Sequence, residues 1–185
     1  MPEPPDLARL SLADVAQAAA EQRLPPVESW HPERSGDSEM RIAADGTWFH
    51  QGSPIARQNM VRLFSTILRR EADGGHVLVT PAEKLSIEVE DAPFVAVEVK
   101  SEGERQARRL AFRLNTGDLV VAGPDRLIRV AGSVEEPRPY LMVRGGMEAR
   151  IGRAAWVDLA GWALDEESDP PGLWSDDAFF LMMPT

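Results

Sequence analysis

The sequence predicts an α+β fold built from two tandem, related units. A short motif occurs once in each half of the chain, each time after a hairpin-like segment and at the start of a helical apolar pattern. After Pro81 the pattern changes to a succession of strands. With 185 residues the chain can bury a core without covalent cross-links. The two copies of the motif are Ile55-x-Arg57-x-x-Met60-Val61-x-Leu63 and Ile151-x-Arg153-x-x-Trp156-Val157-x-Leu159.

Residues 1–24 are predicted to contain a separate N-terminal helix. Ser11 is a suitable N-cap and Asp14 follows three residues later, as in a capping box. The residues that follow are good helix formers, and Pro25-Pro26 ends the segment.

Residues 25–83 form the predicted first unit. Asp45-Gly46 is a two-residue hairpin signal between a strand at 40–43 and its return strand at 47–50. From Arg57 to Arg70, apolar residues recur at intervals of three and four, which predicts a helix. A further strand is expected at 76–80, so the helix covers one face of a small sheet.

Residues 84–185 form the predicted second unit. About seven alternating segments, among them 94–100 and 109–114, predict antiparallel strands, and Pro137 and Pro139 predict a loop between two of them. A helical apolar pattern runs from Gly152 to Leu164. Strands closed by a C-terminal helix are the plan of a pleckstrin-homology-like barrel. The acidic stretch from Asp165 to Asp177 is expected on the surface, followed by an edge strand at 178–182.

The composition narrows the function classes. A formal net charge of −10 argues against binding of long nucleic acid, although a local arginine cluster can still hold one nucleotide or phosphate. The chain has no cysteine and its three histidines have no paired spacing, so neither a metal nor another cofactor is predicted. Residues 1–6 do not resemble a signal sequence, and no apolar run is long enough to cross a bilayer. A cytoplasmic protein without membrane insertion is therefore expected.

Five side chains are the candidate ligand contacts: Arg57, Arg153, Lys84, Thr80 and Trp48. The two arginines hold the same place in the repeated motif, where they could grip a phosphate or, alternatively, brace each hairpin against its helix. Trp48 could stack on a base or pack in the core, whereas Trp156 lies on an apolar stripe that indicates core packing. Thr80 and Lys84 belong to the segment that joins the two halves. Their side chains could contact a ligand or, alternatively, belong to an ordinary capped turn.

Other groups of polar residues favour structural interpretations. Arg109 and Arg113 lie in a basic run on a predicted strand, where solvated cross-strand pairing with residues such as Glu98 is the expected outcome. Asp91-Ala92-Pro93-Phe94 indicates a rigid turn. No phosphate-binding loop, nucleophile elbow or catalytic triad is recognisable.

Six short motifs in the chain form a distinctive set. They are Trp30-His31-Pro32, Asp45-Gly46-Thr47-Trp48, Gly52-Ser53-Pro54-Ile55-Ala56-Arg57, Leu63-Phe64, Val79-Thr80-Pro81-Ala82-Glu83-Lys84 and Val89-Glu90-Asp91-Ala92-Pro93-Phe94. Together they resemble the bacterial family grouped as domain of unknown function 1285, and the resemblance covers the chain from about Pro26 to its end. It implies a two-part α+β fold built by duplication, a second part like a pleckstrin-homology barrel, and a site between the parts for a nucleotide-like or nucleic-acid-derived ligand in signalling.

Three functional hypotheses follow. The first is a non-enzymatic cytosolic sensor that binds a small nucleotide-like anion between its two halves through the five candidate residues. The second is a protein–protein adaptor that uses the barrel and the apolar side chains of the aromatic acidic tail, Leu173, Trp174, Phe179 and Phe180. The third is an unrecognised hydrolase that uses carboxylates and water.

Overall fold

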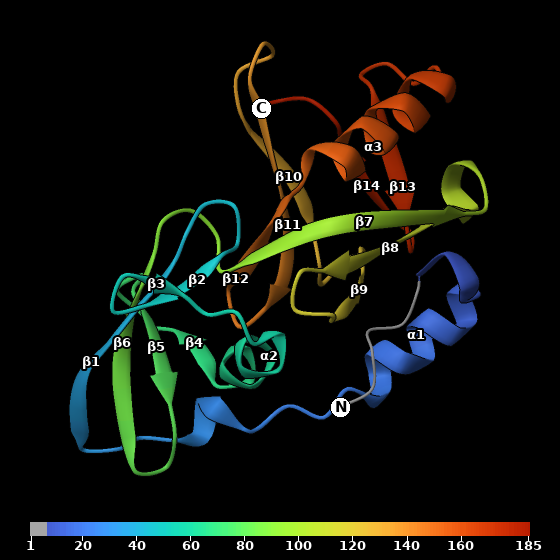
Figure 1. The fold of residues 1–185 in the computed structure, drawn as a ribbon. Coiled ribbons are helices and arrows are strands. Elements are labelled where there is room, and N and C mark those ends of the chain that lie inside the picture. Colours follow the sequence, from blue (N-terminus) through green and yellow to red (C-terminus); the bar gives the residue numbers. More distant parts are fainter. Residues whose placement is uncertain (1–6) are drawn as a thin grey trace. The chain divides into compact units, whose positions relative to one another are not determined.

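The computed structural model describes residues 7–185, and the chain forms two compact units. Unit 1 comprises residues 23–93 with 145–147, and unit 2 comprises residues 7–22, 94–144 and 148–185. The tandem α+β organisation expected from the sequence is present (Figure 1). The chain passes from one unit to the other after Pro93, because the strand that begins at Glu83 completes the sheet of unit 1.

Unit 1 is a six-stranded sheet with one short helix. Its strand order is β3-β2-β1-β6-β5-β4. Fully or nearly fully buried apolar side chains, including Ile42, Leu68 and Val79, form its core. The elements are η2 (Val27–Ser29), β1 (Arg34–Ile42), β2 (Trp48–His50), β3 (Ser53–Pro54), α2 (Gln58–Thr66), β4 (Leu68–Arg70), β5 (His76–Val79) and β6 (Glu83–Val89).

The hairpin predicted at Asp45-Gly46 is confirmed, but helix α2 is shorter than predicted. Gly46 has a φ of 89°, which suits glycine, and Ile42 pairs with Trp48 across the turn. The helix was expected to extend to Arg70, but it ends at Thr66, and the next residues pair with β5 instead. Leu68 is 1% exposed in that strand, so burial in the sheet outweighs the helical spacing of the apolar residues.

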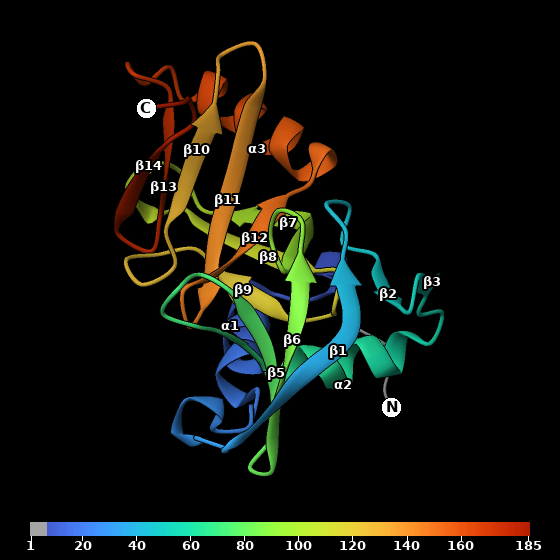
Figure 2. The same ribbon diagram turned by 90° about the vertical axis from the view of Figure 1, so that its left-hand side faces the viewer.

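Unit 2 is a second six-stranded sheet with a longer helix and a separate hairpin. Its strand order is β10-β11-β12-β7-β8-β9 (Figure 2). The elements are η1 (Leu7–Arg9), α1 (Leu12–Glu21), β7 (Phe94–Glu102), η3 (Arg105–Ala107), β8 (Arg109–Leu114), β9 (Leu119–Val121), β10 (Ile128–Gly132), β11 (Pro137–Arg144), β12 (Met147–Ile151), α3 (Arg153–Asp165), β13 (Gly172–Ser175) and β14 (Ala178–Leu181).

The two sheets have the same topology. Each consists of two three-stranded antiparallel meanders, and the first strand of one meander pairs in parallel with the last strand of the other. In unit 1 this central pair is β1 with β6, where Ile42 faces Val89. In unit 2 it is β7 with β12, where Ala96 faces Ile151. Two related units are therefore visible in the strand order.

The repeated sequence motif does not mark equivalent places in these two sheets. Arg57 is the N-cap of α2, which follows the third strand of its sheet. Arg153 is the first residue of α3, which follows the sixth strand of its sheet and has Gly152 as its N-cap. Both helices begin directly after a hairpin, as the sequence predicted. The hairpin before α2 is β2–β3, whereas the hairpin before α3 is β11–β12, which has a different place in its sheet.

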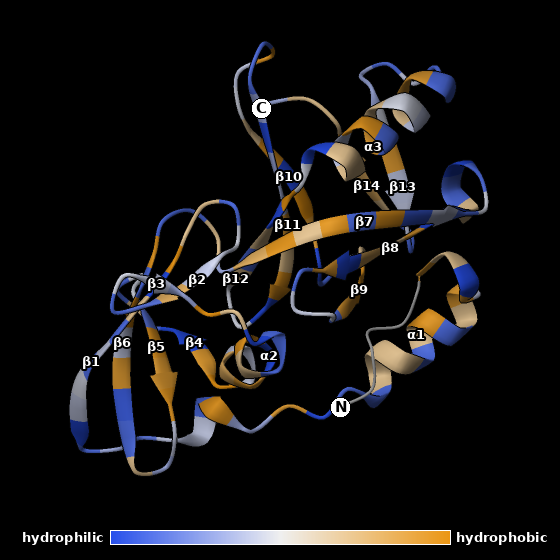
Figure 3. Ribbon diagram, viewed as in Figure 1, coloured by the Kyte–Doolittle hydropathy of each residue, from blue (hydrophilic) through white to orange (hydrophobic). Residues whose placement is uncertain are grey.

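Two finer features expected of unit 2 differ from the structure. The sheet is not fully antiparallel, because β12 returns to pair in parallel with β7. The helix α3 does not end the fold, since the hairpin β13–β14 follows it. The first part of β7 carries hydrophobic colours (Figure 3), and Phe94 and Ala96 in this part are fully buried.

The N-terminal helix belongs to unit 2. Residues 1–6 of the predicted N-terminal segment lie outside the described residues. The capping box is confirmed, because Ser11 Oγ accepts from the N–H of Asp14 at 3.2 Å and Asp14 Oδ2 accepts from the N–H of Ser11 at 3.1 Å. Helix α1 then buries Leu12 and Val15 against Ala111 and Leu119 of β8 and β9.

The acidic stretch predicted as a surface excursion is partly buried. Leu173 and Ser175 of β13 have no exposed surface. Ser175 Oγ accepts from the N–H of Leu110 at 2.9 Å and donates to the carbonyl of Ala122 at 2.7 Å, which fixes β13 beside β8. The strand expected at 178–182 is confirmed as β14, paired with β13. Within residues 7–185, no helix has both the length and the apolar character needed to span a bilayer.

Candidate functional site

Thr80 and Lys84 are occupied by contacts within unit 1. The hydroxyl of Thr80 accepts from the N–H of Glu83 at 3.2 Å and from the N–H of Ala82 at 3.3 Å, so it caps the turn into β6. Lys84 Nζ lies 3.5 Å from Glu71 Oε1, in an ion pair that is partly exposed. Arg69 also binds Glu71, and this hydrogen bond is the main reason that the pKa of Glu71 is lowered. The capped-turn interpretation therefore describes Thr80, whereas Lys84, which that interpretation left in solvent, forms an ion pair.

Trp48 lies in the core of unit 1. Its side chain is among the largest fully buried ones, and the residue is 2% exposed. A ligand base could stack on this ring only by displacing the side chains that cover it. Its indole N–H has no hydrogen-bond partner among the described residues, which costs about 1–3 kcal/mol.

Arg57 and Arg153 are both exposed, one in each unit. Within residues 7–185, no hydrogen bond or ion pair joins either guanidinium group to another side chain or to the backbone. Neither arginine therefore braces a hairpin against its helix in the way that the alternative interpretation required. Both cations stay free to bind an anion, so their role as ligand contacts remains a prediction.

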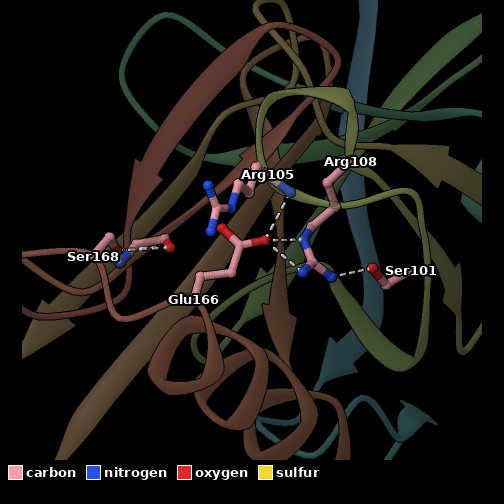
Figure 4. Close-up of polar contacts among 6 residues, drawn as sticks. Ser101, Arg105, Arg108, Glu166 and Ser168 are labelled. Atoms are coloured by element: carbon pink, nitrogen blue, oxygen red, sulfur yellow. Dashed lines mark hydrogen bonds and ion pairs between the residues drawn. The ribbon is translucent and has the colours of Figure 1, made fainter.

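The basic run of unit 2 forms ion pairs, as expected for Arg113, which binds Glu98 at 3.0 Å. Arg109 instead binds Asp176 at 2.9 Å. Arg108 is buried, and its Nε and Nη2 both donate to Glu166 Oε1 at the end of α3 (Figure 4). The same oxygen accepts from the backbone N–H of Arg105 at 2.9 Å, so one carboxylate binds three donors. This cluster stabilises the loop at η3 and is not available to a ligand.

Two of the four apolar side chains considered in the tail are buried. Phe180 is 4% exposed and Leu173 is fully buried. Trp174 packs against Phe179 with a ring separation of 5.3 Å, and Phe179 is 40% exposed. Leu173 and Phe180 thus belong to the core of unit 2, and Trp174 and Phe179 keep exposed surface.

A group of arginines around a tyrosine lies on one face of β10, β11 and β12. The backbone pairing places Arg129 opposite Tyr140, and the period of two in a strand places Arg138 on the same face as Tyr140. The guanidinium of Arg129 lies 4.4 Å from the centre of the Tyr140 ring, and that of Arg150 lies 5.3 Å from it. We call this group the arginine–tyrosine face; its members are Arg129, Arg138, Tyr140, Glu148 and Arg150.

Hydrogen bonds fix the orientation of four of these five side chains. Arg129 binds both oxygens of Glu148, each at 2.7 Å, in a forked arrangement. Arg150 Nη1 donates to the Tyr140 hydroxyl at 3.2 Å. Arg138 is exposed and makes no hydrogen bond or ion pair within the described part of the chain. Three guanidinium groups against one carboxylate give the face a positive charge in a chain with a net charge of −10.

Sequence reasoning missed the arginine–tyrosine face because Pro137 and Pro139 were taken as a loop. The prolines are in fact part of β11, opposite Gly132 and Val130. The available signal was the alternation Arg138-x-Tyr140-x-Met142-x-Arg144, which places four long side chains on one face of a strand. Arg144 on this strand lies 5.0 Å from the ring centre of Phe94, and burial is the main cause of its lowered pKa.

Clusters of titratable side chains and shifts in their pKa values bear on acid–base and metal chemistry. Within residues 7–185, no group of three or more histidine, aspartate or glutamate side chains is close enough to hold a metal ion. His76 is half-buried, and burial followed by the charge of Arg70 lowers its pKa. Its Nε2 has no hydrogen-bond partner in that part of the chain.

The fold defines a two-domain α+β protein in which two sheets share one strand order, and comparisons with known proteins agree with this class. Family models described as "Domain of unknown function (DUF1285), N-terminal domain" and "Protein of unknown function (DUF1285), C-terminal domain" match residues 25–92 and 93–182. The chain belongs to this DUF1285 family. A search of curated proteins found no match.

Two solved structures are similar to this chain. A DUF1285 family protein from Silicibacter pomeroyi DSS-3 is 45% identical, with 95% of this chain and 96% of that chain covered and a TM-score of 0.81. A DUF1285 family protein from Shewanella baltica OS155 is 23% identical, with 70% of this chain and 92% of that chain covered and a TM-score of 0.51. The second likeness concerns the fold alone.

Proposed function

We propose that this protein is a non-enzymatic ligand sensor that binds a small nucleotide-like anion in a signalling role. The observation that carries the proposal is the arginine–tyrosine face, which concentrates positive charge on an otherwise acidic protein. Guanidinium groups bind phosphate through forked hydrogen bonds, and their flat faces also stack on nucleobases. A nucleotide carries both a phosphate and a nucleobase, so guanidinium groups can bind it in both ways.

Arg138 is the central contact in this proposal. It is exposed on the same face as Tyr140, and no side chain of the described residues competes for its donors. Arg129 and Arg150 are oriented by Glu148 and Tyr140, so little conformational freedom is lost when a phosphate binds beside them. Arg57 in unit 1 and Arg153 in unit 2 are separate proposed anion contacts, because each has a free guanidinium group.

The relation of unit 2 to pleckstrin-homology barrels is also part of the proposal. It is supported by a sheet of two meanders whose strand β7 contacts the helix α3. It is weakened by the parallel pairing of β7 with β12 and by the hairpin that follows the helix. A protein–protein adaptor is the second candidate function, and the exposed apolar side chains of α3, described below, favour it.

Isothermal titration calorimetry against a nucleotide panel tests the sensor function. The panel includes mononucleotides, cyclic dinucleotides and inorganic phosphate. We expect at least one nucleotide to bind more tightly than phosphate alone, with an affinity that falls as salt rises. Arg138→Ala should weaken binding about tenfold or more, since a hydrogen bond to a charged group contributes about 1.5–3 kcal/mol.

Arg34→Ala is the matched control, because the Arg34 side chain is 81% exposed and belongs to the other unit. It should leave binding unchanged. Absence of binding across the panel would refute the sensor function. Binding that Arg138→Ala and Arg129→Ala leave intact would refute this face as its site.

A further inference from the structure

Helix α3 has apolar side chains on its exposed side as well as on its buried side. Ala155, Leu159 and Ala163 are buried against the rest of unit 2. On the opposite side, Val157 is 60% exposed and Leu164 is 69% exposed. Figure 3 shows hydrophobic colours on successive turns of this helix. A surface helix normally carries polar residues on the side that faces water, so the exposed side of α3 is suited to contact with another apolar surface.

The exposed apolar residues have the spacing of a coiled-coil seam. Ala154, Val157, Gly161 and Leu164 are separated by three, four and three residues, which places them at successive a and d positions of two heptads. All four are exposed. A Cβ atom added at Gly161 would meet no atom within 4 Å, so the middle of the seam is open and a second helix can approach closely.

The charges beside this seam are complementary to those of a second copy. Arg153 occupies position g and Asp158 occupies position e of the following heptad. In a parallel pair of helices, position g of one helix faces that e position on its partner, so each Arg153 would meet the Asp158 of the other copy. Both side chains are exposed and neither forms an ion pair within residues 7–185. In an antiparallel pair, Asp158 and Asp165 would instead face like charges.

We propose that α3 pairs in parallel with α3 of a second copy of this chain, through the seam Ala154, Val157, Gly161 and Leu164. The seam covers two heptads of one helix, so the contact falls in the class of small, transient interfaces below about 1,200 Å². The dimer is therefore weak and forms only as concentration rises. In this dimer Arg153 pairs with an aspartate of the second copy and is no longer free for a ligand.

Sedimentation equilibrium over a concentration series up to about 1 mM tests the dimer, because weak interfaces of this size need high concentration to form. We expect reversible dimerisation of the full chain. Val157→Glu and Arg153→Asp should abolish it, since each places an acidic side chain at the seam or opposite Asp158. Val134→Glu is the control, because Val134 is 73% exposed in the turn between β10 and β11.

A charge exchange separates helix pairing from anion binding by Arg153. The double variant Arg153→Asp with Asp158→Arg restores the opposite charges between positions g and e, so we expect the dimer to return. An anion held by Arg153 alone would not recover. Circular dichroism of each variant should match that of the original protein, because all the substituted side chains are exposed.

Cross-linking tests the parallel direction, and the chain has no cysteine of its own to interfere. Leu164 lies near the end of α3, so Leu164→Cys brings two thiols together in a parallel pair and keeps them apart in an antiparallel one. We expect a disulfide-linked dimer with Leu164→Cys and none with Val134→Cys. A monomer at every concentration would overturn the proposal, as would a dimer that persists in both Val157→Glu and Arg153→Asp.

Discussion

The buried ion pair between Arg108 and Glu166 provides the sharpest stability prediction. The two side chains are 9% and 12% exposed, and the Arg108 guanidinium also donates to the Ser101 hydroxyl (Figure 4). Glu166→Ala would leave a buried cation without its carboxylate and two arginines without their acceptor. Removing one partner of a buried pair costs about 3–5 kcal/mol, because the remaining charge is desolvated and unpaired.

Thermal unfolding measures this loss directly. For a chain of this length, about 3–5 kcal/mol corresponds to a melting temperature lowered by roughly 6–20 °C. Glu166→Gln keeps an oxygen acceptor and loses the charge, so it should lie between Glu166→Ala and the original protein. The matched control is Glu98→Ala in the same unit, whose pair with Arg113 is 35% and 28% exposed and contributes about 0.2–1 kcal/mol.

Comparison of these variants decides whether burial of the pair matters. If Glu166→Ala melts at the same temperature as Glu98→Ala, the Arg108 site is open to water and the reasoning fails. Raising the salt concentration should reduce the effect of Glu98→Ala, because exposed charges are screened. The effect of Glu166→Ala should persist, since a buried pair is screened much less.

Three further changes test packing, hydrogen bonding and protonation. Gly172→Ala should destabilise unit 2 by about 1–3 kcal/mol, because the new Cβ atom would lie 2.4 Å from Phe179 Cζ and 2.7 Å from the carbonyl oxygen of Phe180. Gly161→Ala is the comparison, because Gly161 lies in open space on a helix, and this change should stabilise unit 2 by about 0.5–1 kcal/mol in dilute solution. The midpoints of unfolding in urea measure both effects. Ser175→Ala should cost about 2–4 kcal/mol, since it leaves the N–H of Leu110 and the carbonyl of Ala122 unpaired in the core, whereas Ser133→Ala in an exposed turn should change the urea midpoint little. Burial lowers the pKa of His76 from its ordinary value of 6.5, so the unfolded chain binds more protons than the folded one, and stability is lost as the pH falls below 6.5 towards the lowered pKa. The free energy of unfolding of His76→Leu should therefore vary less between pH 7.5 and 5.5 than that of the original protein. An equal variation would show that His76 is not the group that titrates.

The sequence predicted most of the individual strands, but not which strands lie next to each other. Alternation along 94–100 and 109–114 identified β7 and β8, because one face of each strand is buried. The same pattern does not reveal that β7 also pairs with β12, since periodicity specifies a face and not a neighbour. The parallel centre of each sheet is therefore a long-range feature that local pattern cannot supply.

Composition was misleading in the acidic segment after α3. Its charges and prolines predicted a surface excursion, yet Leu173 and Ser175 are fully buried. Two buried residues on one face of a short strand are enough to attach it to the sheet, and the exposed charges beside them dominate the composition. The helical spacing of apolar residues from Arg57 to Arg70 also predicted the wrong structure at its end. Leu68 fits the apolar side of a helix or of a strand, and in the structure it begins β4.

The candidate site was predictable only in part. The turn at Thr80 and the free arginines at 57 and 153 were both among the alternatives that the residues suggested. The burial of Trp48 could not be separated from a stacking role, since a tryptophan next to a hairpin turn fits either place. The arginine–tyrosine face depends on a strand that contains two prolines, which local propensity argues against.

The parallel pair at the centre of the first sheet determines how that unit responds to a pulling force. The chain enters the sheet at Arg34 and leaves it after Val89, and these two strands lie side by side and run the same way. Tension applied to the two ends would therefore load the hydrogen bonds between β1 and β6 lengthwise, in shear, so that many must break together. Unfolding under force is governed by the barrier to unfolding, and this geometry raises that barrier relative to a hairpin that opens one bond at a time.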